Sequence, residues 1–117
     1  MADDHPITVT PNPHRVRVVV GGVIVAETTN ALTLKEANYP PVQYIPRADV
    51  QMDLFAPTAR RTHCPYKGDA SYFTITAGGL EQRDGAWSYE TPRAEVAAIA
   101  GHLAFYGNKV DAIEERT

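Results

Sequence analysis

The chain contains a single cysteine, Cys64, which excludes an internal disulfide and a zinc site built from cysteine pairs. No apolar run approaches the roughly 18 residues that a membrane-spanning helix needs. A basic excess is also missing, because the formal net charge is −3, and this argues against a dedicated nucleic-acid binder. The polar, acidic residues 1–4 do not resemble a signal peptide. We therefore expect a cytoplasmic protein without a nucleic-acid or membrane partner.

The length of 117 residues suits one domain with a modest core. Hydrophobic residues make up 44% of the chain and charged residues 21%, as in an ordinary globular protein. Pro6, Pro11 and Pro13 remove backbone donors near the start of the chain. We therefore expect a mobile N-terminal segment over residues 1–14 and a single β-rich domain over residues 15–117.

Two stretches have the alternating pattern of antiparallel strands. In the first, residues 15–20 and 23–27 flank Gly21-Gly22, a pair suited to a two-residue hairpin turn. Pairing across this turn would place Val23 and Val25 beside Val20 and Val18 on one face. Further strands are expected at residues 31–35 and 42–45.

The second stretch predicts strands at residues 71–77, 80–83 and 86–89, with turns at 78–79 and 84–85. Each stretch presents one apolar face. We therefore predict a mainly β fold of two antiparallel sheets, packed as a bent sandwich or a partly open barrel.

One helix is predicted near the C-terminus. Thr91 can cap it, Pro92 suits its first position, and Val96, Ile99, Ala100 and Leu103 follow the spacing of a buried stripe. The helix could end at Gly101, with a strand after it, or continue to residues 107–108. We favour the short version.

Known catalytic motifs are missing: the chain has no phosphate-binding glycine loop and no serine nucleophile elbow. Residues 62–69 instead gather a thiol, an imidazole, a phenol and an ammonium, and these four groups lie in the acid-free stretch between Asp53 and Asp69. Cys64 could act as a nucleophile beside cations, or pack as a small buried side chain. On an extended chain, however, His63 and Cys64 would point in opposite directions. Lys67 is a candidate contact for an anion, and we expect it to be exposed.

Residues 39–50 form a second unusual segment, which begins Tyr-Pro-Pro and contains two candidate ligand contacts, Tyr44 and Arg47. Arg47 could clamp a carboxylate, or simply pair with Asp49 on the surface. Trp87 could belong to the core, or form the floor of a pocket with its indole N–H as donor.

Four segments, at residues 39–50, 62–72, 86–89 and 103–106, resemble the domain of unknown function 427 family, sometimes labelled nucleotidyltransferase-like. The most specific is Thr-His-Cys-Pro-Tyr-Lys-Gly. The resemblance spans about residues 15–113. It implies a small β-rich protein of bacteria and some fungi, without an established activity. It also implies a bent pair of antiparallel sheets similar to the β-tent group.

Neither a metal nor another cofactor is expected from the residues. Members of the β-tent group commonly hold zinc through cysteine pairs, which one cysteine cannot reproduce. Metal-dependent nucleotidyl transfer needs clustered carboxylates, and the candidates Asp49, Asp53 and Asp69 are not closely spaced.

Three functions remain open. In the first, a pocket between the sheets, rimmed by Tyr44, Arg47, Lys67 and Trp87, binds a small anionic or aromatic metabolite. In the second, Cys64 is the nucleophile of an enzyme, with His63 or another histidine as base. In the third, an exposed sheet edge forms a homodimer. The binding module is the hypothesis that we favour.

Overall fold

The computed structural model describes residues 5–117, which are mainly β. The strands are β1 (Ile7–Asn12), β2 (Arg15–Val20), β3 (Val23–Thr28), β4 (Ala31–Glu36), β5 (Val42–Tyr44), β6 (Phe55–Cys64), β7 (Gly68–Ala77), β8 (Leu80–Tyr89), β9 (Ala104–Phe105) and β10 (Ala112–Arg116). Short 3-10 turns connect them: η1 (Arg47–Asp49), η2 (Met52–Leu54), η3 (Ala94–Ile99) and η4 (Gly107–Lys109).

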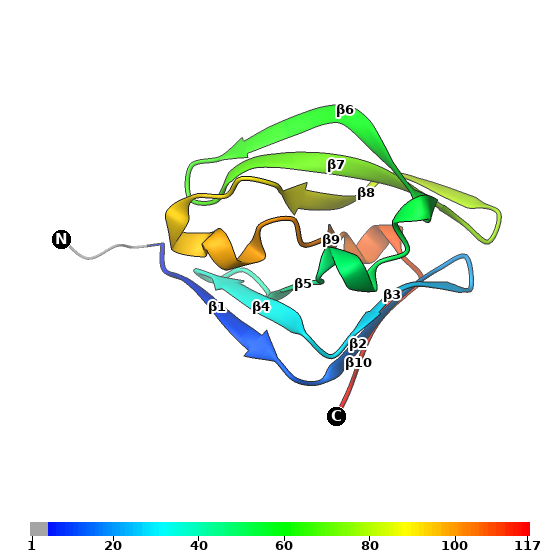
Figure 1. Ribbon diagram of the computed structural model, residues 1–117, viewed down its shortest axis with the longest axis horizontal. Helices are drawn as coiled ribbons and strands as arrows, with labels where there is room; N and C mark the ends of the chain where they lie inside the picture. Colours follow the sequence, from blue (N-terminus) through cyan, green and yellow to red (C-terminus); the bar gives the residue numbers. More distant parts are fainter. Residues whose placement is uncertain (1–4) are drawn as a thin grey trace.

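The strands form three antiparallel sheets, where the sequence predicted two. Their strand orders are β1-β4-β5, β10-β2-β3 and β6-β7-β8-β9. Figure 1 shows β6, β7 and β8 along one side of the molecule, and β1, β4, β2, β3 and β10 along the other. β5, β9 and the 3-10 turns lie between them. The arrangement is open, because no sheet closes into a barrel within residues 5–117.

Both glycine turns connect paired antiparallel strands, as predicted. Gly21, Gly22, Gly78 and Gly79 all have positive φ, which side chains rarely tolerate. The two turns also contact each other through their backbones (Figure 1). A Cβ added to Gly78 would lie 1.8 Å from the carbonyl oxygen of Gly21, so no side chain fits at this contact.

Two details differ from the prediction, the register of the first hairpin and the length of β8. Val20 pairs with Val23 as expected, but a bulge places Val18 opposite Ala26 instead of Val25. The predicted turn at residues 84–85 is wrong, because β8 continues from Leu80 to Tyr89. Residues 83–85 bulge out there, and the Asp84 N–H donates to the side chain of Thr74 on the neighbouring strand.

The predicted C-terminal helix is also wrong: residues 5–117 contain no α-helix. Residues 94–99 form 3-10 turns that are interrupted at Val96, although Val96 and Ile99 are buried as the stripe predicted. The chain then leaves the helical path. Gly101 N–H donates to the Tyr89 carbonyl, and Leu103 exchanges backbone hydrogen bonds with Ile45. These long-range bonds override the local helical pattern.

The N-terminal segment contains a strand where the sequence suggested none. Residues 7–12 form β1, which pairs with β4 over its whole length. Pro11 is tolerated because β1 lies at the edge of its sheet. Residues 1–4, the rest of the predicted mobile start, lie outside the described residues.

Two hydrophobic clusters fill the interior. The first joins the buried valines of β2 and β3 to Phe73, Ile75 and Ala77 of β7. The second joins Leu34 and Tyr44 to the aromatic residues of β7 and β8 and to η3. The second cluster surrounds the candidate site. No helix in the described part of the chain is long and apolar enough to cross a membrane.

Candidate functional site

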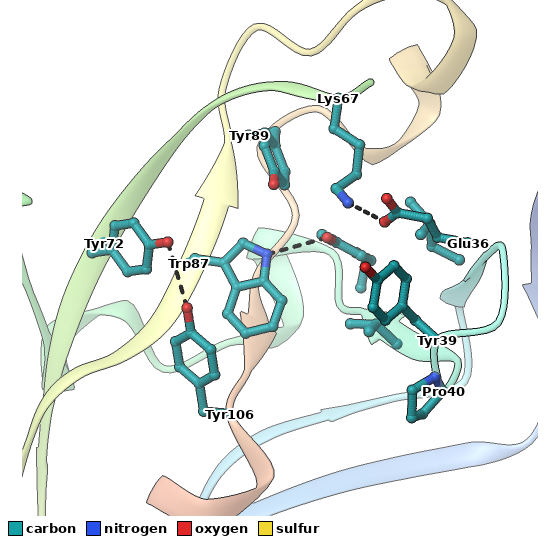
Figure 2. Close-up of a pocket in the computed structure, with 11 residues that line it drawn as sticks. Glu36, Tyr39, Pro40, Lys67, Tyr72, Trp87, Tyr89 and Tyr106 are labelled. Atoms are coloured by element: carbon teal, nitrogen blue, oxygen red, sulfur yellow. Dashed lines mark hydrogen bonds and ion pairs between the residues drawn. The ribbon is translucent and has the colours of Figure 1, made fainter. Parts of the chain in front are cut away.

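A cavity of about 180 Å³ lies between the β1-β4-β5 sheet and the β6-β7-β8-β9 sheet (Figure 2). Its walls are mostly aromatic, and an ion pair closes one side. It is lined by Leu34, Glu36, Tyr39, Pro40, Val42, Tyr44, Lys67, Tyr72, Trp87, Tyr89 and Tyr106.

Strand pairing explains why several of these rings share one cavity. Tyr72 of β7 lies directly opposite Trp87 of β8, and Ala70 lies opposite Tyr89. Side chains directly opposite in an antiparallel pair share a face, and residues two apart along a strand share it too. The small side chain of Ala70 leaves room beside Tyr89. The alternation of β7 and β8 therefore places Tyr72, Trp87 and Tyr89 on the same wall.

Trp87 is held by Tyr44 from the opposite sheet. The indole Nε1–H donates to the Tyr44 hydroxyl oxygen over 3.1 Å, and the rings meet edge to face. Tyr44 is almost completely buried, and this burial raises the pKa of its phenol above the ordinary value. The phenol therefore keeps its proton at neutral pH. Since Trp87 occupies an acceptor site of this oxygen, the Tyr44 O–H can still donate.

Tyr89 supplies a second phenol. Burial raises its pKa too, so it is also a donor at neutral pH. No hydrogen bond joins its hydroxyl to another group of residues 5–117. Figure 2 shows this hydroxyl directed into the space beside Trp87.

Tyr72 and Tyr106 lie on the side of Trp87 that faces away from Lys67 and Glu36 (Figure 2). Their rings are parallel, with centroids 6.5 Å apart, and Tyr106 Oη donates to Tyr72 Oη over 3.4 Å. Burial, and the bond to Tyr72, raise the pKa of Tyr106 to about 12. Tyr72 Oη also shares a hydrogen bond with Thr62. These two hydroxyls are therefore engaged with protein groups.

An ion pair between Lys67 and Glu36 closes the cavity. Lys67 Nζ donates to Glu36 Oε1, and His5 binds the other carboxylate oxygen. The Lys67 and Glu36 side chains are only 12% and 13% exposed. Burial alone would raise the pKa of Glu36, but the hydrogen bonds from Lys67 and His5 hold it below its ordinary value. The ammonium also lies 5.9 Å from the centre of the Tyr89 ring.

Three of the four residues predicted for the pocket, Tyr44, Lys67 and Trp87, line this cavity. Arg47 does not. Its guanidinium binds the Glu90 carboxylate at 3.1–3.2 Å and donates to the Gly101 carbonyl over 3.0 Å. The suggested surface pair with Asp49 is not formed either, since Asp49 accepts from Thr28.

The structure separates the two candidate catalytic residues. Cys64 is partly buried against the second hydrophobic cluster, whereas His63 is exposed and its Nδ1 lies 2.7 Å from Asp69 Oδ1. This separation follows from the alternation along β6. Nor do residues 5–117 bring three or more His, Cys, Asp or Glu side chains together in an arrangement that could hold a metal ion.

Eight lining residues were not in the predicted set, and five of these carry polar side-chain groups: Glu36, Tyr39, Tyr72, Tyr89 and Tyr106. A signal for the four tyrosines was present, because each lies in one of the segments 39–50, 62–72, 86–89 and 103–106. All four segments meet at this cavity. Glu36 had no such signal, since its partner Lys67 is 31 positions away.

A family model described as a domain of unknown function, DUF427, matches residues 8–116. The match covers nearly the whole chain, and the chain belongs to this family. The search of curated proteins found no match.

Proposed function

We propose that this DUF427 protein binds a small anionic metabolite with a flat or otherwise apolar body in the cavity between Tyr44, Lys67 and Trp87. The supporting observation is the set of hydrogen-bond donors inside aromatic walls. Tyr44, Tyr89 and Lys67 all line one cavity, and Figure 2 shows the Tyr89 hydroxyl and the Lys67 ammonium directed into it. Apolar walls with a few fixed polar groups are typical of small-molecule sites.

Several donors at this site are free, whereas its carboxylate is already engaged. The Tyr44 oxygen already accepts from Trp87, and both oxygens of Glu36 are bound by Lys67 and His5. An ammonium has three protons, so Lys67 retains donors beyond the one that Glu36 accepts. A ligand oxygen with negative charge satisfies such a site better than a cation does.

The charge of the ion pair limits the charge of the ligand. Glu36 compensates Lys67, and a dianion such as phosphate would face strong repulsion from the Glu36 carboxylate. A carboxylate carries a single charge and presents two acceptor oxygens, which match the two phenols and the ammonium. We therefore favour a monocarboxylate.

Binding can be followed directly through Trp87, because it is the only tryptophan of the chain and lines the cavity. Phenylacetate, which is not strongly fluorescent, should change the emission of Trp87 in a saturable titration. Phenylacetamide has the same shape without the charge and should bind at least tenfold more weakly, since hydrogen bonds to charged groups contribute roughly 1.5–3 kcal/mol.

The residue test is Tyr89→Phe, which removes one hydroxyl and leaves the ring in place. It should weaken phenylacetate binding about tenfold. Tyr66→Phe is the matched control, because Tyr66 is exposed and does not line this cavity. If phenylacetate fails to bind, or binds equally well to the Tyr89→Phe variant, the proposal is wrong.

A further inference from the structure

A second, larger cavity adjoins the first. It has a volume of about 580 Å³ and shares five lining residues with the smaller one: Tyr39, Pro40, Val42, Trp87 and Tyr106. The same side chains border both spaces, so the two cavities are neighbours, and we refer to them as the two compartments of the proposed site. The shared residues form the waist between them.

The larger compartment is apolar. Beyond the waist its walls include Val18, Ile45, Phe105 and Ile113. Beyond the waist it is also lined by two polar side chains, Gln43 and Glu115, and each has an oxygen that is already hydrogen-bonded. Gln43 Oε1 accepts from Asn12 and Thr33, and Glu115 Oε2 is bound by Asn12 and His14. The compartment therefore favours hydrocarbon.

The volumes show which part of a ligand each compartment can take. Small-molecule sites usually enclose roughly 300–1,000 Å³. The polar compartment, at about 180 Å³, is below this range and suits a head group, whereas the apolar compartment lies within it. The donors Lys67, Tyr44 and Tyr89 all belong to the polar compartment.

We propose that the ligand is an elongated monocarboxylic acid, with its carboxylate at Lys67, Tyr44 and Tyr89 and its hydrocarbon chain extending past Trp87 into the apolar compartment. This inference rests on the proposed function and adds the shape and the polarity of the ligand. The waist rings, Trp87 and Tyr106, lie 4.5 Å apart between centroids, and they offer flat faces along which a chain can pack.

Chain length is the direct test. Butanoate, hexanoate, octanoate and decanoate should each change Trp87 emission, with affinity rising about fourfold for each methylene that becomes buried. The rise should stop when the compartment is full. A dissociation constant that does not change from butanoate to octanoate would overturn the inference.

Ile113→Gln tests the location of the chain. Ile113 lines the apolar compartment and is 42% exposed, so the exchange should not prevent folding. It should reduce the advantage of octanoate over butanoate at least fivefold and leave butanoate binding unchanged. Ile24→Gln is the matched control, since Ile24 is 37% exposed, lies on the other edge strand of the same sheet and does not line the compartment. If Ile113→Gln disturbs the circular dichroism spectrum, Pro41→Asn is used instead, because Pro41 is also exposed and lines the same compartment.

The outcomes separate the two proposals. If butanoate binds and is weakened by Tyr89→Phe, but longer acids gain nothing, the proposed function stands and the elongated ligand is wrong. If octanoate gains affinity equally in wild type, Ile113→Gln and Pro41→Asn, the chain lies elsewhere and the inference is also wrong. If neither phenylacetate nor any of the alkanoates binds, both proposals fail.

Discussion

The Lys67–Glu36 ion pair should stabilise the fold as well as form part of the site. We expect Lys67→Met to lower the free energy of unfolding by about 2 kcal/mol. A hydrogen bond to a charged group is worth roughly 1.5–3 kcal/mol, and breaking a fully buried pair costs roughly 3–5 kcal/mol. The lower value applies because water still reaches both side chains and because His5 continues to bind Glu36.

Urea unfolding, followed by Trp87 fluorescence and circular dichroism, measures this cost. Lys67→Met, Glu36→Gln and the double variant form a cycle whose coupling energy should exceed about 1 kcal/mol. A loss of 2 kcal/mol corresponds to a fall in melting temperature of about 8 °C for a domain of this size. Glu95→Gln is the control: its ion pair with Arg93 is exposed and 3.6 Å long, so the change should stay within about 0.5 kcal/mol.

If both single variants stay within about 0.5 kcal/mol of wild type and their effects add, the reasoning is refuted. Lys67 would then behave as a surface cation. The sequence alone suggested this outcome, because nothing near Lys67 in the chain indicates that Glu36 and Tyr89 enclose its side chain. The structure reverses the expectation of an exposed Lys67, because its side chain is 12% exposed and paired, and Lys67→Ala should lower the melting temperature.

Two further predictions concern the fold. Gly78→Ala should destabilise the protein by about 3 kcal/mol and Gly79→Ala by about 1 kcal/mol, because both have positive φ but only Gly78 contacts the backbone of Gly21. Equal melting temperatures of the two variants would contradict this difference. The lowered pKa of Glu36 means that its stabilising effect is present above about pH 4.5 and is lost as the pH falls below it. Urea midpoints between about pH 6 and pH 3 should therefore fall less steeply for Glu36→Gln than for wild type.

The hairpins could be predicted from the sequence because each turn is determined by residues that are adjacent in the chain. Gly21-Gly22 and Gly78-Gly79 adopt the positive φ angles that two-residue turns need, whatever the rest of the chain does. The bulge in β8 could not be predicted in the same way. An Asp-Gly pair favours a turn, and here the Asp84 backbone instead binds the side chain of Thr74 on β7.

The helix prediction failed for a similar reason. The spacing of Val96 and Ile99 correctly indicated burial, but periodicity does not show where the backbone finds its hydrogen bonds. In the fold, Gly101 and Leu103 bind Tyr89 and Ile45, and these pairings cannot be read from a single local window. The six residues of η3, of which Val96 and Ile99 are buried, therefore form 3-10 turns.

For the site, the sequence predicted the chemistry of the lining residues better than it predicted their interaction partners. Tyr44, Lys67 and Trp87 were identified as aromatic and cationic residues in unusual segments, and they line one cavity. Arg47 was chosen on the same grounds, but its partner is Glu90, 43 positions away. Which cation faces the cavity depends on which carboxylate each one meets, and that is fixed only by the packing of the sheets.

The same contacts that hold the sheets together also fix the proposed binding groups in position. The Trp87 indole is held by Tyr44 from the opposite sheet, and the Lys67 backbone is anchored on both sides, by N–H donation to Cys64 and by accepting from Arg93. Groups held in this way lose little freedom when a ligand arrives, so more of the interaction energy appears as affinity. We therefore expect the proposed site to select ligands through the positions of its donors and the shape of its two compartments, without requiring a loop to close over them.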